Sequence, residues 1–179
     1  IVAQRKLVEL LKKQKRGLLR EVFEVKAGGE WLPFSSLAVR RTEKASAHNA
    51  NESTPCVELE HIEPETGRLL GSVSLGMQVS LKRVCHPNDI LFGKLRPYLR
   101  KVAFIETACV ATSEAWVLTA TNLILPRFLF YLIQTEPFMR TANISSGTKM
   151  PRAEWPRVAQ AHFTFHPRCV KNRLPIALP

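Results

Sequence analysis

Apolar side chains recur at helical spacing over residues 4–23, at the start of the chain. This spacing predicts an amphipathic helix with lysines and arginines on its outer side. Four positions follow the four-three-four spacing of a coiled-coil seam, and they are Leu7, Leu11, Gln14 and Leu18. No capping residue precedes them, so we expect residues 1–25 to be the end of a longer coiled-coil helix. An ordinary amphipathic surface helix is the alternative.

After Gly28 and Gly29, which we expect to end the helix and act as a hinge, the pattern changes to short alternating runs. Residues 40–55 are polar and rich in small side chains, which predicts an exposed loop. Strands are predicted at residues 56–62, 77–84, 90–105, 113–118 and 158–165. We therefore expect residues 30–179 to form one domain with several strands.

Helical periodicity returns after Thr121. Pro126 suits the first position of a helix, and an apolar stripe follows it. Thr135 then predicts the cap of a second short helix. Together with the strands, this order predicts an α+β fold, in which a mixed, curved β-sheet packs against a few helices.

The segment Asn88–Lys101 gathers four cations around one tyrosine. If the segment is extended, its side chains alternate between two faces. One face then carries Lys94, Arg96, Tyr98 and Arg100, next to Lys101, and the other carries Leu95, Pro97 and Leu99. Pro97 disfavours a helix and places the strand at a sheet edge or at a break into a loop. Such a cationic ridge suits a phosphate backbone, and a solvated basic strand face is the alternative.

The charge balance indicates a polyanionic partner. The 179 residues include 26 lysines and arginines against 15 acidic residues, for a formal net charge of +11. This favours nucleic acid, and Arg40 and Arg41 before the polar loop are further candidates for phosphate contacts. An anionic membrane surface is the second candidate, but the sequence has no long uncharged apolar run and no signal peptide. We therefore expect a cytoplasmic protein without a membrane partner.

Residues 143–152 combine small hydrogen-bond donors with two cations. The donors are Ser146, Gly147 and Thr148, and the cations are Lys149 and Arg152. Backbone amides and hydroxyls here could hold phosphates, whereas a lysine or arginine could reach a base edge. No glycine precedes Gly147 at Walker spacing, so this is not predicted to be a nucleotide-binding loop.

Four cysteines are widely spread along the chain and lack the paired spacing of a zinc site. They are Cys56, Cys85, Cys109 and Cys169. The sequence also has no glycine-rich cofactor loop. We therefore expect no metal and no other cofactor.

Several stretches, taken in order, carry a resemblance to a known family. They are Lys15–Leu19, Val57–Ile62, Asp89–Lys101, Thr112–Glu114, Phe128–Leu132, Ser146–Pro151 and Trp155. The chain resembles a target recognition domain of the specificity (S, HsdS) subunit of type I restriction-modification enzymes, over nearly its whole length. The resemblance implies a non-catalytic domain of mixed strands and helices that reads one half of a bipartite DNA site.

The resemblance also implies partners. Methylation and cleavage would belong to the methyltransferase (M) and restriction (R) subunits. A full subunit carries two recognition domains joined by two long helices in an antiparallel coiled coil, and a helix before the domain fits the second of them. Residues 166–173 depart from the Leu-Pro-rich segment, Glu-Gln pair and new helix of the family. We therefore expect a fragment or a truncated subunit.

Two alternatives stay open. A truncated subunit could form a homodimer through its helix, or occupy the methyltransferase unproductively, which would be a regulatory role. A small metal-dependent nuclease could use four carboxylates, those of Glu58, Glu60, Glu63 and Asp89. These carboxylates have a simpler interpretation as solvated strand and turn residues, and the chain has no Asn-Pro-Pro-Tyr or Asp-Pro-Pro-Tyr run of an adenine methyltransferase.

Overall fold

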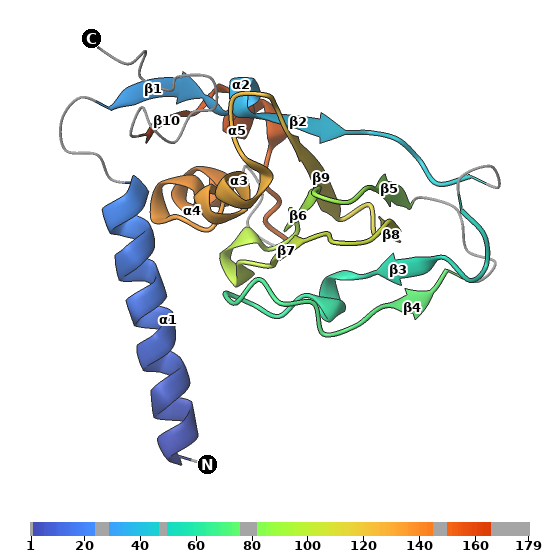
Figure 1. The fold of residues 1–179 in the computed structure, drawn as a ribbon, viewed down its shortest axis with the longest axis horizontal. Helices are drawn as coiled ribbons and strands as arrows, with labels where there is room; N and C mark the ends of the chain where they lie inside the picture. Colours follow the sequence, from blue (N-terminus) through green and yellow to red (C-terminus); the bar gives the residue numbers. More distant parts are fainter. Residues whose placement is uncertain (1, 24–28, 47–49, 76–81, 145–149, 166–179) are drawn as a thin grey trace, which may run out of the picture.

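Helices and short strands alternate along the chain in the computed structural model, which describes residues 2–23, 29–46, 50–75, 82–144 and 150–165 (Figure 1). The helices are α1 (Val2–Phe23), α2 (Phe34–Leu37), α3 (Pro126–Leu132), α4 (Glu136–Asn143) and α5 (Trp155–Gln160), with 3-10 turns η1 (Leu59–His61) and η2 (Pro97–Leu99). The strands are β1 (Glu30–Pro33), β2 (Ala38–Arg41), β3 (Pro55–Val57), β4 (Val73–Ser74), β5 (Arg83–Cys85), β6 (Ile90–Gly93), β7 (Val102–Phe104), β8 (Cys109–Ala111), β9 (Ala115–Ala120) and β10 (His162–Phe165).

The strands form three sheets among the described residues. One is four-stranded, in the order β2-β9-β6-β7, and every neighbouring pair in it is antiparallel. A second has the order β4-β3-β8-β5 and is mixed, because β3 and β8 run parallel. The third is the antiparallel pair of β1 and β10, which joins the two ends of the domain. The predicted α+β class with mixed strands and a few helices is confirmed.

An aromatic cluster fills the core between the first sheet and the helices. Phe138 of α4 is fully buried, and its ring centroid lies 5.1 Å from that of Phe34 and 5.3 Å from that of Phe92. Phe163 of β10 packs on the same ring at 5.8 Å. Aromatic rings at these separations attract one another beyond their burial. Helix α4 is therefore packed against α2, β6 and β10, which come from the start, the middle and the end of the domain.

Helix α1 runs away from the domain and contacts it along one side only (Figure 1). Its Phe23 ring packs 4.6 Å from that of Phe128 in α3. The Lys15 ammonium group donates to the Gln134 side chain at 2.6 Å and to the carbonyl of Glu65 at 3.0 Å. Burial lowers the pKa of Lys15, although the Glu65 carboxylate acts in the opposite direction. These contacts fix the carboxyl-terminal half of the helix on the domain.

The predicted coiled-coil seam of α1 is not covered by the described residues of the domain. Leu7, Leu11, Gln14 and Leu18 are all exposed, and Leu11 and Leu18 each keep 55% of their surface in contact with solvent. The predicted helix is therefore present, and its apolar seam is open to solvent beside α3. In the part of the chain that the structure describes, nothing covers this seam.

The helix starts were predicted more accurately than the strand ends. Pro126 begins α3, and the Thr135 hydroxyl accepts a hydrogen bond from the Phe138 amide at the start of α4, both as predicted. The strand predicted at residues 56–62 ends at Val57 and gives way to η1. The strand predicted at 158–165 begins only at His162, because Pro156 occupies the first turn of α5, where its missing amide hydrogen costs nothing. Of residues 77–84, only the last three are described.

Candidate nucleic-acid interface

The basic segment 94–101 is a compact turn and is not extended. Strand β6 ends at Gly93, and Pro97 begins the 3-10 turn η2. Arg96 and Arg100 flank this turn with φ values of 50° and 52°, in the left-handed region. The predicted alternation of Lys94, Arg96, Tyr98 and Arg100 on one strand face is therefore wrong, because two left-handed residues reverse the direction of the chain.

The turn connects β6 to its antiparallel neighbour β7. The Gly93 amide donates to the Lys101 carbonyl at 2.9 Å, which closes the base of the turn. Pro97 is buried, whereas Tyr98 keeps 54% of its surface exposed. The segment thus projects Tyr98 from a base that two strands hold.

Two stretches that the sequence singled out separately lie next to each other. Leu95 forms an antiparallel bridge with Arg152. The Arg96 amide donates to the Pro151 carbonyl at 2.8 Å, and the Ala153 amide donates to the Lys94 carbonyl at 2.9 Å. The carboxyl-terminal end of the loop at 143–152 is therefore bound directly to the basic turn.

Glu114 contributes to the same junction, although it was not among the predicted site residues. Its carbonyl accepts from the Lys94 amide at 3.0 Å, and its carboxylate accepts from Arg152 Nε at 3.1 Å. The run Thr112–Glu114 belonged to the family resemblance, which was the one signal for this residue in the sequence. Ser146, Gly147, Thr148 and Lys149 lie outside the described residues.

Lys94 and Arg96 are the two cations of the turn whose side chains have no partner among the described residues. Arg96 is exposed and Lys94 is half-buried. Within the residues that the structure describes, neither side chain makes a hydrogen bond or an ion pair. Together with the exposed Tyr98 ring, they form a surface that we call the basic turn surface, defined by Lys94, Arg96 and Tyr98.

The other cations predicted for this site have partners inside the protein. Arg100 donates to the Glu136 carboxylate at 2.6 Å, at the start of α4. The Lys101 ammonium group donates to the Leu59 carbonyl at 2.6 Å, which ties the turn to η1. Arg152 is bound to Glu114, as described above. These three side chains therefore hold the turn in place through internal contacts. A contact with a ligand would have to replace or share those bonds.

Arg40 and Arg41 also take part in the fold. The Arg40 guanidinium lies 5.3 Å from the centre of a Trp155 ring, a cation–π contact. Arg41 Nε donates to Asp89 Oδ2 at 3.0 Å, and Asp89 is only 1% exposed. The Thr119 hydroxyl donates to the same carboxylate at 2.6 Å. Arg41 is therefore the counter-ion of a buried carboxylate.

The carboxylates considered for a nuclease are held separately. Among the described residues, no group of three or more histidine, cysteine, aspartate or glutamate side chains could hold a metal ion. Asp89 binds Arg41, and Glu58 binds Lys82. Partial burial raises the pKa of Glu58, but the hydrogen bond from Lys82 and the charge of Lys82 lower it further and leave it below its usual value. None of the helices in the described ranges is long and apolar enough to cross a membrane.

Comparisons with known proteins give one kind of match. No family model and no curated protein matches the chain. Among solved structures, a chain from a study of complex assembly and conformational transition of the type I R-M system matches with a TM-score of 0.68 at 19% identity. The HsdS subunit from Thermoanaerobacter tengcongensis matches with a TM-score of 0.67 at 18% identity.

Each match covers 82% of this chain, and the chain spans 40% of the length of each matched structure. At such low identity the likeness shows the fold alone. The family resemblance seen in the sequence is confirmed at that level, because the protein has the fold of part of an HsdS subunit.

Proposed function

We propose that this protein is a DNA-recognition domain of the type I restriction-modification specificity kind, which reads one half of a bipartite site and catalyses no reaction itself. The observation that carries the proposal is the junction of residues 94–96 with residues 151–153. It brings the basic turn surface next to Arg152, at the end of the predicted phosphate-binding segment, on a fold shared with an HsdS subunit.

Within this proposal, the basic turn surface contacts DNA directly. Arg96 is the best candidate to reach a base edge, because a guanidinium can donate two hydrogen bonds to guanine in the major groove. Lys94 neutralises a phosphate, and Tyr98 stacks or donates a hydrogen bond. Arg152, which is bound to the same junction through Glu114, is a second candidate to reach a base edge. The phosphate contacts predicted for residues 146–149 stay predictions, because these residues lie outside the described ranges.

Arg41, Arg100 and Lys101 have positioning roles in this proposal. Each is already bound to an internal acceptor, so a DNA contact would have to replace or share that bond. The phosphate contacts predicted for them from the sequence are therefore ranked below that of Lys94.

The experiment that tests the proposal is selection of bound duplexes from a random DNA pool at moderate salt, followed by sequencing. Enrichment of a short motif would support base reading by this domain. Binding without enrichment would reduce the proposal to electrostatic attraction. Lack of binding by the folded protein at low salt would contradict it.

Replacing Lys94 by alanine is expected to weaken binding to all DNA sequences alike. The slope of log K against log salt should fall by about one ion, because one phosphate contact is lost. Lys6→Ala is the matched control, since it removes the same charge near the amino end of α1, which points away from the domain (Figure 1). An unchanged slope for Lys94→Ala, measured by titration at several salt concentrations, would remove the phosphate assignment.

We further propose that the seam of α1 packs on a helix of a partner, either a second copy of this chain or another part of a methyltransferase and restriction complex. An apolar groove of about 520 Å³ runs between α1 and α3, and Leu11, Leu18 and Phe128 line it. A second apolar helix would bury these side chains, which supports this role.

The double variant Leu11→Glu and Leu18→Glu is expected to abolish helix-mediated association. Both side chains are half-exposed, so the domain should keep its fold while the seam gains two charges. Sedimentation of the chain alone and co-elution with the methyltransferase subunit are the two readouts. Lys13→Glu, on the other side of the helix, is the control. Association that survives the double variant would show that the seam is not the contact.

A further inference from the structure

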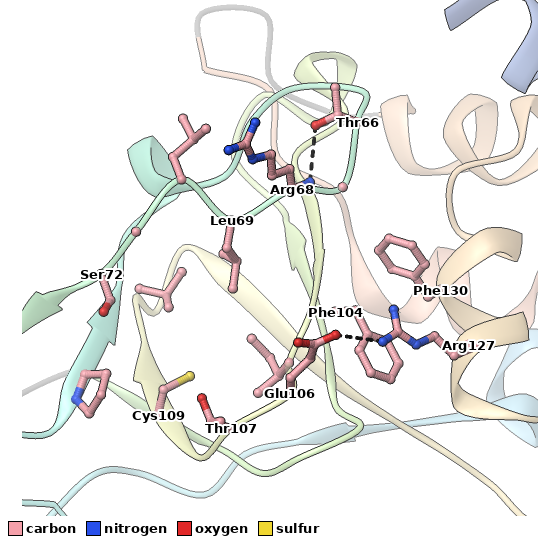
Figure 2. A pocket seen from close by; sticks show the side chains of 16 residues that line it. Thr66, Arg68, Leu69, Ser72, Phe104, Glu106, Thr107, Cys109, Arg127 and Phe130 are labelled. Atoms are coloured by element: carbon pink, nitrogen blue, oxygen red, sulfur yellow. Dashed lines mark hydrogen bonds and ion pairs between the residues drawn. The ribbon is translucent and has the colours of Figure 1, made fainter. Parts of the chain in front are cut away.

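An open cavity of about 650 Å³ is lined by none of the three residues of the basic turn surface (Figure 2). Residues 66–72 form one wall, and the turn between β7 and β8 forms another. On the α3 side, the Arg127 guanidinium lies 3.8 Å from the centre of the Phe104 ring and donates to the Glu106 carboxylate at 2.8 Å. The proposed DNA-recognition function gives this cavity no role.

Cys109 brings a nucleophile to the cavity wall. Its side chain is 7% exposed, and Figure 2 shows its sulfur turned into the cavity beside Thr107. Strand β8 carries Cys109 at its first position. A reagent that enters the cavity therefore meets this thiol without unfolding of the sheet.

Cys85 lies directly opposite Cys109 in the neighbouring strand. The antiparallel register of β5 and β8 pairs the two residues, so both side chains point to the same face of the sheet. The Val84 amide donates to the Glu43 carbonyl, on the side of β5 away from β8. Because backbone amides alternate in direction along a strand, the backbone amide of Cys85 points toward Cys109. Opposed residues of this kind have Cα atoms about 5.5 Å apart, inside the range that a disulfide spans. Cys85 is fully buried and does not line the cavity.

Cys56 provides an internal reference on the opposite face. It pairs with Val110 in the parallel register of β3 and β8, and Val110 points away from the face of Cys109. Cys56 and Val110 belong to a separate apolar cluster, whereas Cys85 and Cys109 share one. Two thiols of the same sheet thus meet each other, and a third does not.

The two opposed thiols differ in acidity. A hydrogen bond with Cys85 lowers the pKa of the Cys109 thiol, although burial acts in the opposite direction. The same hydrogen bond, together with burial, raises the pKa of Cys85 well above its usual value. Burial likewise raises the pKa of Cys56. Cys109 also lines the cavity whereas Cys85 does not, so Cys109 is the thiol of the pair that a reagent reaches first.

We propose that Cys109 is an oxidative modification site reached through this cavity, with Cys85 as its resolving thiol, so that hydroperoxides convert the pair to a cross-strand disulfide. In the first step the Cys109 sulfur attacks one oxygen of the hydroperoxide. The O–O bond breaks, an alcohol or water leaves after taking up a proton, and Cys109 becomes a sulfenic acid.

In the second step the Cys85 sulfur attacks the Cys109 sulfur. The S–O bond breaks, the S–S bond forms, and the hydroxyl leaves as water with the Cys85 proton. Overall, two thiols lose two electrons and two protons, and the hydroperoxide gains them. A thiol reductant reverses the change by exchange through a mixed disulfide.

The test uses the unchanged chain, because trypsin separates its four cysteines. Cleavage after lysine and arginine places Cys56 in residues 45–68, Cys85 in 84–94, Cys109 in 102–127 and Cys169 in 169–171. The folded protein is treated with hydrogen peroxide, its free thiols are alkylated, and the peptides are analysed by mass spectrometry. We expect peptides 84–94 and 102–127 joined, with the loss of two hydrogen atoms, and separated again by dithiothreitol.

Alkylation of the reduced, folded protein gives a second readout. Iodoacetamide should modify Cys109 at least about tenfold faster than Cys56, because Cys109 lines the open cavity and its thiol pKa is lowered, whereas that of Cys56 is raised. In Cys85→Ser, dimedone should trap a sulfenic acid on Cys109, since the resolving thiol is gone. Cys56→Ser should leave the cross-link intact.

Equal alkylation rates for Cys56 and Cys109 would overturn the assignment of Cys109. Peroxide-treated wild-type protein without the joined peptides would overturn the role of Cys85. Both results come from the unchanged chain, so a variant that fails to fold cannot obscure them. Neither readout involves DNA, so the outcome is independent of the proposed recognition function.

Discussion

Replacing Arg41 by alanine is expected to lower the free energy of unfolding by about 3 kcal/mol. The substitution leaves the Asp89 carboxylate, which is 1% exposed, without its counter-ion. The Thr119 hydroxyl and the His86 amide still donate to it, at 2.6 Å and 2.8 Å, but neither carries a charge. Because Arg41 itself is partly exposed, we place the effect at the lower end of the range for broken buried pairs. Urea denaturation near neutral pH measures it.

A variant of an exposed ion pair and a double variant serve as controls. Arg157→Ala removes an arginine from an exposed pair with Glu154 and should cost less than about 1 kcal/mol. Adding Asp89→Asn to Arg41→Ala should recover part of the loss, because the unpaired charge disappears and the new amide can donate to Thr119. If Arg41→Ala instead left stability unchanged and reduced the salt dependence of DNA binding, Arg41 would be a phosphate contact.

Replacing Arg96 by alanine is expected to cost about 1–3 kcal/mol of specific binding, or roughly a fivefold to 150-fold rise in Kd for the selected sequence. The loss should be confined to one base position, where discrimination between bases is relaxed, because a single side chain reads that position. Titrations with the selected duplex and with single-base variants measure both effects. Non-specific binding should change much less.

Stability measurements separate this loss from damage to the fold. Arg96 is exposed and has no side-chain partner among the described residues, so alanine should not unfold the protein. Arg96→Gly should be at least as stable as the wild type, since glycine adopts the left-handed backbone at this position without strain. Arg5→Ala, on α1, is the charge-matched control. A uniform loss of affinity for all duplexes would make Arg96 a phosphate contact.

Local signals predicted α1, α3 and α4 well, whereas α2 was not predicted and α5 overlaps a predicted strand. Proline at the first position of α3 and a threonine cap before α4 act within one turn of the chain, so their effect can be read without the fold. The apolar period of α1 predicted its extent, but not that Lys15 and Arg16 would bind the domain while the apolar seam stays exposed. The α+β class followed from the order of these elements.

The shape of the basic turn could not be read in the same way. Alternating cationic and apolar residues from Lys94 to Arg100 satisfy the strand pattern. No glycine or asparagine in this stretch indicates a left-handed backbone. Arginine rarely adopts that conformation, and it does so here because the strands on both sides fix the ends of the turn. Tertiary structure therefore decided the conformation.

Ion pairs between residues distant in the sequence could not be predicted from the sequence either. Arg41 and Asp89 are separated by 48 positions, and Arg152 and Glu114 by 38. Their charges suggested solvent or DNA, and only the sheet topology shows that they satisfy each other. The same holds for Cys85 and Cys109, whose opposition depends on the register of β5 and β8. The sequence identified the basic segments but not which of their charges are free.

The hydrogen-bonded base of the turn between β6 and β7 means that exposed residues within the turn can be substituted without changing the two strands. The backbone bond from Gly93 to Lys101 and the strand ladder below it hold the two ends, whichever residues lie between them. A change of loop length there costs little, because each doubling adds only about 0.6 kcal/mol of closure entropy. Libraries randomised at the exposed positions 96, 98 and 99, with the buried Pro97 kept, would thus search new DNA targets on an unaltered scaffold. The same separation would let specificity diverge through a few substitutions while the core stays intact.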